Sequence, residues 1–301
     1  MNNIPLVLSC FMNNFQHRVL TNMDSSGFGV RLDNRLSSYI PPHWHREAEL
    51  LLFIKGHVTC NIESTSLHFK RGDLFLINSL QVHETRCSRD AEYLVVHIAP
   101  EQMCLFMPTF DQLSFRLSFQ PEQQEKAAAY EQLKKHMEQI LHLTRQTNPD
   151  AVLERESHLF AVAALLVRHF SQSLAVEETK LQRSDMLRLE PVMEYVNLHF
   201  AEELSLDEAA NLMGLNREYF CRLFKKNMGV SFLQYVYQVR TTAVCRELET
   251  TEDPIGDIAQ RNGFRDPKML NQYFKEIYGC TPSEKRKAFR EVTLEDWEET
   301  V

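Results

Sequence analysis

Two histidines and a glutamate near the start of the chain have the spacing of metal ligands. They lie in the stretch PPHWHREAELLLFIKG, residues 41–56, which places His43, His45 and Glu49 before an apolar run. Side chains two residues apart in a strand point to the same side, so we expect His43 and His45 to share a face. Imidazole and carboxylate groups bind Fe, Mn, Zn or Ni. The stretch predicts either a metal site or a pocket that binds an organic molecule with the same polar groups.

The segments around this stretch are predicted to be short β-strands. The strand-like runs are GFGVRL, AELLLFIKG, HVTCNIES, SLHFKRG, DLFLINS and EYLVVHIAP. In the third run Val58, Cys60 and Ile62 alternate with polar residues, so they should form one apolar face. Gly, Asn, Asp and Pro interrupt the runs at close spacing, which is typical of an antiparallel barrel or sandwich.

The apolar period becomes helical after about residue 121. Tyr130, Leu133, Met137 and Ile140 recur at spacings of three or four. Asn148-Pro149-Asp150 then interrupts the chain, and Asp150 is expected to cap a second helix. The two helices are predicted either to pack on the barrel only or to form a homodimer seam as well.

Two segments of the C-terminal third have the pattern of helix-turn-helix units. In residues 204–229, Ser205 and Glu208 suit a capping box, Gly214 suits a tight turn, and Asn216 should cap a second helix. The inner face of that helix is expected to hold Tyr219, Phe220, Leu223 and Phe224. Its outer face would carry Arg217, Glu218, Cys221, Arg222, Lys225 and Lys226.

The same parts recur in order in residues 253–287. Asp266 should cap the second helix of this unit, with Leu270, Tyr273 and Phe274 inside. Its outer face would carry Lys268, Asn271, Gln272 and Lys275. A cationic helix face taken alone is usually only a solvated surface. Here two such units occur in order, and residues 231–249 predict one long helix that joins them. Two rigidly joined units would place recognition helices in successive major grooves of DNA.

Residues 190–290 closely resemble the DNA-binding domain of the AraC/XylS family of bacterial transcription regulators. The residues that carry the resemblance are Leu206, Ala209, Ala210, Gly214, Phe220, Arg222, Phe224, Lys225 and Gly229, then Ile255, Ile258, Ala259, Gly263, Phe264, Phe274, Lys275, Gly279, Thr281, Pro282 and Arg286. The resemblance implies that Glu218, Cys221 and Arg222 face bases from the first unit, and Lys268, Met269, Asn271 and Gln272 from the second. Pro267 is a departure that a first helical turn tolerates.

The N-terminal part resembles the cupin barrel that regulators of this family commonly carry as an effector domain. His43-x-His45-x3-Glu49-x6-Gly56 fits the first cupin motif, and residues 72–78 followed by His83 fit the second. Asn78, Leu80 and Cys87 replace the usual proline, glycine and asparagine. The resemblance implies that His43, His45, Glu49 and His83 line the pocket and could bind a divalent metal. With the aromatic residues Trp44 and Tyr39 they would suit a sugar-like effector.

The predicted fold is a two-domain α+β protein, with a cupin-type barrel and helices followed by an all-α double helix-turn-helix domain. The expected boundaries are a barrel at 1–120, a helical packing or dimerisation segment at 121–172, a linker at 173–186, a DNA-binding domain at 187–290 and an acidic tail at 291–301.

Composition bears on the cellular compartment and on how the chain could bind DNA. The chain has 301 residues, a net charge of −8 and seven cysteines with no Cys-x-x-Cys pair, which favours a reducing cytoplasm over a disulfide framework or zinc finger. No signal segment or membrane-spanning run is apparent. Because the overall charge is negative, any DNA binding must depend on local clusters.

Three functional hypotheses remain. The first is a transcription regulator, not an enzyme, that binds double-stranded operator DNA as a homodimer, responds to a small molecule and contacts RNA polymerase if it activates. No cofactor would be required. The second is a cupin metalloenzyme with an appended DNA-binding domain. The third is a regulator controlled by a partner protein or by its own expression level, in which the histidines are structural.

Overall fold

The computed structural model describes residues 26–33, 39–62, 65–117, 124–146, 148–173 and 176–298. Their contacts divide them into two units. The barrel unit holds the described residues within 18–38 and 43–184, and the helical unit holds those within 39–42 and 185–301. The division at Ser184 lies inside the stretch expected to be the linker.

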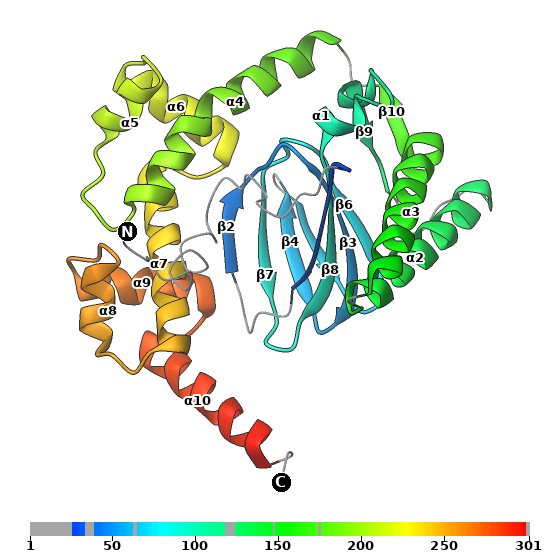
Figure 1. The fold of residues 1–301 in the computed structure, drawn as a ribbon. Helices are drawn as coiled ribbons and strands as arrows, with labels where there is room; N and C mark the ends of the chain where they lie inside the picture. Colours follow the sequence, from blue (N-terminus) through cyan, green and yellow to red (C-terminus); the bar gives the residue numbers. More distant parts are fainter. Residues whose placement is uncertain are drawn as a thin grey trace, which may run out of the picture. The chain divides into compact units, whose positions relative to one another are not determined.

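Two four-stranded sheets form the main β-structure (Figure 1). The first has the order β1 (Phe28–Asp33), β8 (Glu92–Ile98), β3 (Ala48–Lys55), β6 (Leu74–Ile77). The second has the order β2 (Tyr39–His43), β7 (His83–Cys87), β4 (Val58–Ile62), β5 (Thr65–Phe69). All six predicted strand-like runs form strands, whereas β2 and β7 were not predicted. Pro41 and Pro42 obscured β2, and they are tolerated there because β2 is an edge strand.

The central strand β3 is buried on both faces. Leu51 and Phe53 pack between the two sheets against residues such as Cys60 and Val95. Leu50 and Leu52 point to the opposite face, where the helices cover the first sheet. Burial on both faces explains why LLLFI, residues 50–54, is continuously apolar and does not alternate. On β4, by contrast, Val58, Cys60 and Ile62 are the buried face, as predicted.

Helices α2 (Gln124–Thr144) and α3 (Pro149–Leu165) cover the outer face of the first sheet (Figure 1). Both were predicted, and both pack on the sheet. The cap of α3 is Asn148, not Asp150, because Pro149 occupies the first helical position and Asp150 lies in the first turn. A single π-helical turn, η2 (Leu166–Phe170), continues α3.

Short elements complete the barrel unit. They are α1 (Pro100–Met103), the 3₁₀ turn η1 (Phe110–Gln112), and the two-stranded pair of β9 (Leu113–Phe115) with β10 (Ser171–Ser173). The pairing of β9 with β10 places the end of η2 next to the segment that follows β8 and α1.

The helical unit contains the two predicted helix-turn-helix units. Its helices are α4 (Val176–His199), α5 (Leu206–Leu212), α6 (Arg217–Met228), α7 (Phe232–Thr250), α8 (Ile255–Arg261), α9 (Pro267–Tyr278) and α10 (Pro282–Glu298). Most of the stretch expected to be a linker is the beginning of α4, whose Glu, Lys, Gln, Arg and Leu residues are good helix formers. Likewise α10 continues into the stretch expected to be an acidic tail. Among the described helices, none is long and apolar enough to span a bilayer.

Candidate functional site

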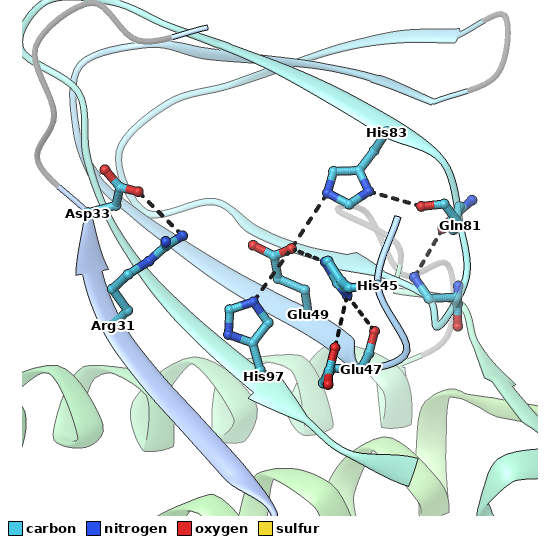
Figure 2. Close-up of polar contacts among 9 residues, drawn as sticks. Arg31, Asp33, His45, Glu47, Glu49, Gln81, His83 and His97 are labelled. Atoms are coloured by element: carbon cyan, nitrogen blue, oxygen red, sulfur yellow. Dashed lines mark hydrogen bonds and ion pairs between the residues drawn. The ribbon is translucent and has the colours of Figure 1, made fainter. Parts of the chain in front are cut away.

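Strands of the two four-stranded sheets bring histidines and a glutamate together (Figure 2). His43 ends β2, Glu49 lies near the start of β3, and His83 begins β7. His45 follows β2 in the connection to β3. The ligand atoms of His43, His45 and His83 lie within 4.8 Å of one another. We call His43, His45, His83 and His97, together with Glu49, the histidine cluster.

His97 is a member that the sequence patterns did not identify. It lies on β8 directly opposite Glu49 on β3, and its Nε2 is 4.0 Å from Glu49 Oε2. His45, Glu49 and His97 form a second close group with ligand atoms within 4.8 Å. A histidine inside the apolar run LVVHI was the available signal, but the pairing register that brings it to Glu49 is not written in one sequence.

Hydrogen bonds fix the protonation of His45. Its Nδ1 lies 2.9 Å from the carbonyl oxygen of Glu47, and its Nε2 lies 2.8 Å from Glu49 Oε2. Both partners accept hydrogen bonds, so both ring nitrogens carry protons and His45 is an imidazolium. Burial alone would lower the pKa of His45, but the hydrogen bond to Glu49 and the charges of Glu49 and Glu47 raise it above its usual value.

His83 has the opposite character. Its Nδ1 donates to the carbonyl oxygen of Gln81 at 2.9 Å. Burial and the charge of His45 lower the pKa of His83 to about 4, so the ring is neutral at pH 7. A neutral ring with its proton on Nδ1 leaves a lone pair on Nε2. That lone pair lies 3.7 Å from Glu49 Oε2, the oxygen that accepts the hydrogen bond from His45 Nε2.

Burial also affects the pKa values of His97 and Glu49. Burial lowers the pKa of His97 to about 3. The charge of Glu49 acts to raise this pKa, whereas the charges of His45 and Arg31 lower it further. Burial alone would raise the pKa of Glu49, but the hydrogen bond from His45 and the surrounding imidazoles hold it well below its usual value. His45 and Glu49 therefore form an ion pair, and His83 and His97 are two neutral buried imidazoles beside it.

A cation lies beside the cluster on β1. Arg31 Nη2 is 3.4 Å from Asp33 Oδ2, and about a third of the Arg31 side chain is exposed (Figure 2). Arg31 Nε is buried and has no hydrogen-bond partner within the described residues. Neither residue was among the predicted site residues. Tyr39 and Trp44, which were predicted, are both buried: Tyr39 begins β2, and Trp44 directly follows its last residue.

The departures from the cupin motifs have a structural account. Asn78, in place of proline, accepts a hydrogen bond from the Phe115 amide at 2.7 Å and donates one to the Phe115 carbonyl at 3.0 Å. Leu80, in place of glycine, has the left-handed φ of 62° that favours glycine, and its amide donates to the His45 carbonyl at 2.8 Å. Gly56, the glycine that fits the first cupin motif, has φ 70°, and a Cβ there would meet the Ala91 backbone at 2.7 Å.

The first helix-turn-helix unit has the predicted caps. Ser205 and Glu208 form a capping box at the start of α5, and Asn216 accepts from the Tyr219 amide at the start of α6. Phe220, Leu223 and Phe224 are buried as predicted, but Tyr219 is 42% exposed and does not belong to the inner face. The exposed residues of α6 include Arg217, Glu218, Arg222, Lys225 and Lys226, and Cys221 is half-buried.

The second unit repeats this arrangement. Asp266 accepts from the Lys268 amide, Pro267 occupies the first turn of α9, and Leu270 and Phe274 are buried. Tyr273 is half-buried and stacks on Tyr237 of α7, with ring centroids 4.9 Å apart. The exposed residues of α9 include Lys268, Asn271, Gln272 and Lys275, and Met269 is half-buried.

A buried arginine joins the end of α4 to the turn of the second unit. Arg240 on α7 donates to the carbonyl oxygens of Phe200 and Glu202, both at 2.6 Å. Its guanidinium also lies over the ring of Tyr237, 5.3 Å from the centroid. Gly263 completes the contact, because a Cβ there would lie 2.7 Å from Arg240 Nε and 2.9 Å from the Phe200 carbonyl. No sequence pattern pointed to this role for Arg240.

Comparison with known proteins agrees with the predictions for both halves of the chain. Residues 26–163 match the model of the AraC-like ligand binding domain, and residues 209–288 match that of a helix-turn-helix domain. The chain belongs to the AraC family. It is a DNA-binding transcription regulator with an N-terminal effector-binding domain.

The individual relatives are distant. The chain is 22% identical to the helix-turn-helix transcriptional regulator YdeC of Bacillus subtilis, over 86% of this chain and 90% of that protein. It is 24% identical to the probable transcriptional regulator LumQ of Photobacterium leiognathi, over 80% of this chain and 90% of that protein. Among solved structures, ToxT of Vibrio cholerae is 14% identical over 87% of this chain and 98% of its own, with a TM-score of 0.46.

Proposed function

We propose that a small hydroxylated molecule binds at the histidine cluster and changes how α6 and α9 bind operator DNA. The observation that carries the proposal is a buried group of imidazole and carboxylate side chains beside Arg31, whose Nε is buried and has no hydrogen-bond partner within the described residues. A buried donor without a partner lowers stability, and a ligand oxygen at Arg31 Nε would supply the missing acceptor.

The chemistry of these groups favours a polyol or sugar as effector. A hydroxyl group can donate to His83 Nε2 or Glu49 and accept from a donor such as Arg31 Nε. A simple carboxylate would face the Glu49 carboxylate and the His83 lone pair, and both would repel it. Sugars offer several hydroxyls at neighbouring positions, which suits a site with donors and acceptors on different strands.

A divalent metal is the second way to satisfy the same atoms. His43, His45, His83 and Glu49, with His97 beside them, form a donor set that Fe, Mn, Zn or Ni accepts. The set fits a metal in composition, but His45 would first have to give up the Nε2 proton that it donates to Glu49. A bound metal would supply a Lewis acid. The regulator function proposed here requires none, and we propose no catalytic activity.

The DNA contacts are assigned to the exposed faces of α6 and α9. Arg222, with Glu218 and Cys221, is proposed to face bases from α6, while Lys225, Lys226 and Arg217 contact phosphates. Lys268, Met269, Asn271, Gln272 and Lys275 take the corresponding positions on α9. We further propose that the regulator acts in the cytoplasm as a homodimer, and that it contacts RNA polymerase where it activates.

A ligand screen against the full chain tests the effector proposal. Thermal unfolding is followed with a panel of monosaccharides, polyols and organic acids, each with and without chelator. A compound that binds only the native state raises the unfolding temperature in proportion to its concentration over Kd. We expect a sugar or polyol to do so in the presence of chelator, and His83→Ala to abolish the shift. The matched control is His57→Ala, an exposed histidine outside the cluster.

The same screen separates the alternatives. Stabilisation by metal alone, with stoichiometric metal in the purified protein and turnover of a small substrate, would support the metalloenzyme. A protein that no compound stabilises, but whose operator binding responds to a second protein, would support control by a partner.

A further inference from the structure

A pair of histidines lies outside the histidine cluster, on the two helices that cover the first sheet. His136 on α2 and His158 on α3 are both half-buried. Their Nδ1 atoms are 2.8 Å apart, and their ring centroids are 5.0 Å apart with the ring planes tilted by 55°. Two ring nitrogens this close share a hydrogen, so one ring donates from Nδ1 and the other accepts with its lone pair. Both rings therefore aim the same nitrogen at one point between the helices.

Buried neighbours hold the backbone on which both histidines lie. Met137 on α2 and Leu159 on α3, the residues that follow the two histidines, are fully buried. Both belong to the apolar core between the helices and the first sheet. The packed helices thus keep the two imidazoles close together, and small rotations of the side chains adjust their separation.

The charge state of the pair suits a metal ion at neutral pH. Burial lowers the pKa of His136, and the charge of His158 lowers it further. A neutral imidazole needs only to carry its proton on Nε2 to offer the Nδ1 lone pair to a metal. His45 in the histidine cluster differs, because neighbouring acceptors hold protons on both of its nitrogens.

We propose that His136 and His158 form a binding site for a divalent transition-metal ion, with Zn²⁺ as the expected occupant. Zinc binds imidazole nitrogens at about 2.0–2.1 Å, so two such ligands in a tetrahedral arrangement lie about 3.3 Å apart. Side-chain rotation that widens the present 2.8 Å separation by about half an ångström accommodates the ion. The ion takes the place of the shared proton and joins α2 to α3.

An acidic residue on α3 can complete the site. Glu154 precedes His158 by four residues, so the two side chains lie on the same face of the helix. The Glu154 side chain is exposed and can rotate toward the ion, while water fills the remaining position. Two imidazoles, one carboxylate and one water are a ligand set that zinc accepts.

Counting bound zinc in matched variants tests the site. The full chain is stripped of metal with a chelator, and zinc is then titrated in competition with a coloured zinc indicator. We expect His136→Gln and His158→Gln each to lower the zinc bound per chain by about one ion. Glu154→Gln keeps both imidazoles and should weaken the site about tenfold. His142→Gln, at an exposed histidine elsewhere on α2, should leave zinc binding unchanged.

A cysteine substitution keeps the test informative if a glutamine variant folds poorly. His158→Cys exchanges one zinc ligand for another, so this variant should still bind zinc. Loaded with Co²⁺, it should show a thiolate-to-cobalt absorption that is absent in the natural protein and in the double variant His136→Gln/His158→Cys. Equal zinc binding by the natural chain and both glutamine variants would overturn the proposal. Zinc that is lost only on substitution within the histidine cluster would overturn it as well.

Discussion

At the scale of single residues, the cluster holds imidazoles in two charge states within a few ångströms. His45 is protonated because two acceptors hold its two nitrogens, whereas His83 and His97 are neutral because they are buried beside that cation. The negative charge of Glu49 balances the positive charge of His45, so it does not also keep His83 and His97 protonated. The difference matters for binding, since the neutral rings are the ones with a nitrogen still able to take up a ligand group.

The neutral histidines predict a stability that falls with acid. The pKa values of His83 and His97 are lowered in the folded protein, so the unfolded chain binds more protons below pH 6.5. Stability should therefore decrease as the pH falls from 6.5 toward 4, by up to about 1.4 kcal/mol per pH unit for each histidine. Urea unfolding at pH 7, 6 and 5, with chelator present, measures the slope.

A substitution assigns that slope to the cluster. His97→Asn removes one of the two titrating groups and should reduce the pH dependence by about one proton. His57→Asn, at the exposed histidine, should leave the slope unchanged. A free energy of unfolding that stays constant between pH 7 and pH 5 would contradict the assignment of neutral buried rings.

Arg222 carries the residue-scale prediction for DNA. It is exposed on α6 beside the exposed Tyr219 ring, 6.0 Å from its centroid. If it contacts a base, Arg222→Ala should weaken operator binding by about 1–3 kcal/mol and relax preference at one base pair. Lys226→Ala should instead weaken binding to all sequences and reduce the salt dependence by about one ion. An operator affinity for Arg222→Ala within about 0.5 kcal/mol of the natural protein would refute the base contact.

At the scale of elements, local signals predicted the helical unit well. Caps such as Ser205, Asn216 and Asp266 lie within three residues of the amides they bind, so their roles can be read from neighbouring sequence. Tyr219 is the exception. Tyr219 is next to the buried Phe220, at the boundary between the buried and the exposed face of α6. The helical period alone does not decide whether a tyrosine at this boundary is buried or exposed.

The barrel unit was less predictable because its decisive contacts join distant residues. His43, Glu49 and His83 could be named from motif spacing. His97 and Arg31 could not, since only the register of β1, β8 and β3 brings those strands together. The strand β2 was missed because two prolines argue against a strand unless the strand is known to lie at an edge.

Arg240 supports an element-scale prediction. Arg240→Met leaves the carbonyls of Phe200 and Glu202 without their donor, which should cost about 1–3 kcal/mol of unfolding free energy. Because Arg240 joins the end of α4 to the turn before α9, footprints should also lose protection at the half-site read by α9 before the one read by α6.

A second arginine provides the control for Arg240. Arg261→Met removes an exposed arginine that pairs with Glu247 and Asp253, and it should change stability by less than about 1 kcal/mol. Equal effects of the two substitutions, or equal loss of both half-sites, would argue against a positioning role for Arg240.

At the scale of the whole molecule, the chain joins two parts with different roles. The barrel unit offers a buried polar cluster, and the helical unit offers two exposed recognition helices. An effector can alter operator affinity only as far as it binds the two conformations of the chain with different affinity. The coupling is reciprocal, so operator DNA should change the affinity for the effector by the same factor.

Operator affinity with and without effector is the measurement that tests this account most directly. An operator fragment is selected from random DNA by the full chain, and its binding is followed by fluorescence anisotropy with the sugar or polyol that stabilises the protein. The account predicts a change in Kd of about 5- to 150-fold, absent in His83→Ala although that variant still binds the operator. An affinity for the operator that is identical with and without saturating effector would contradict it.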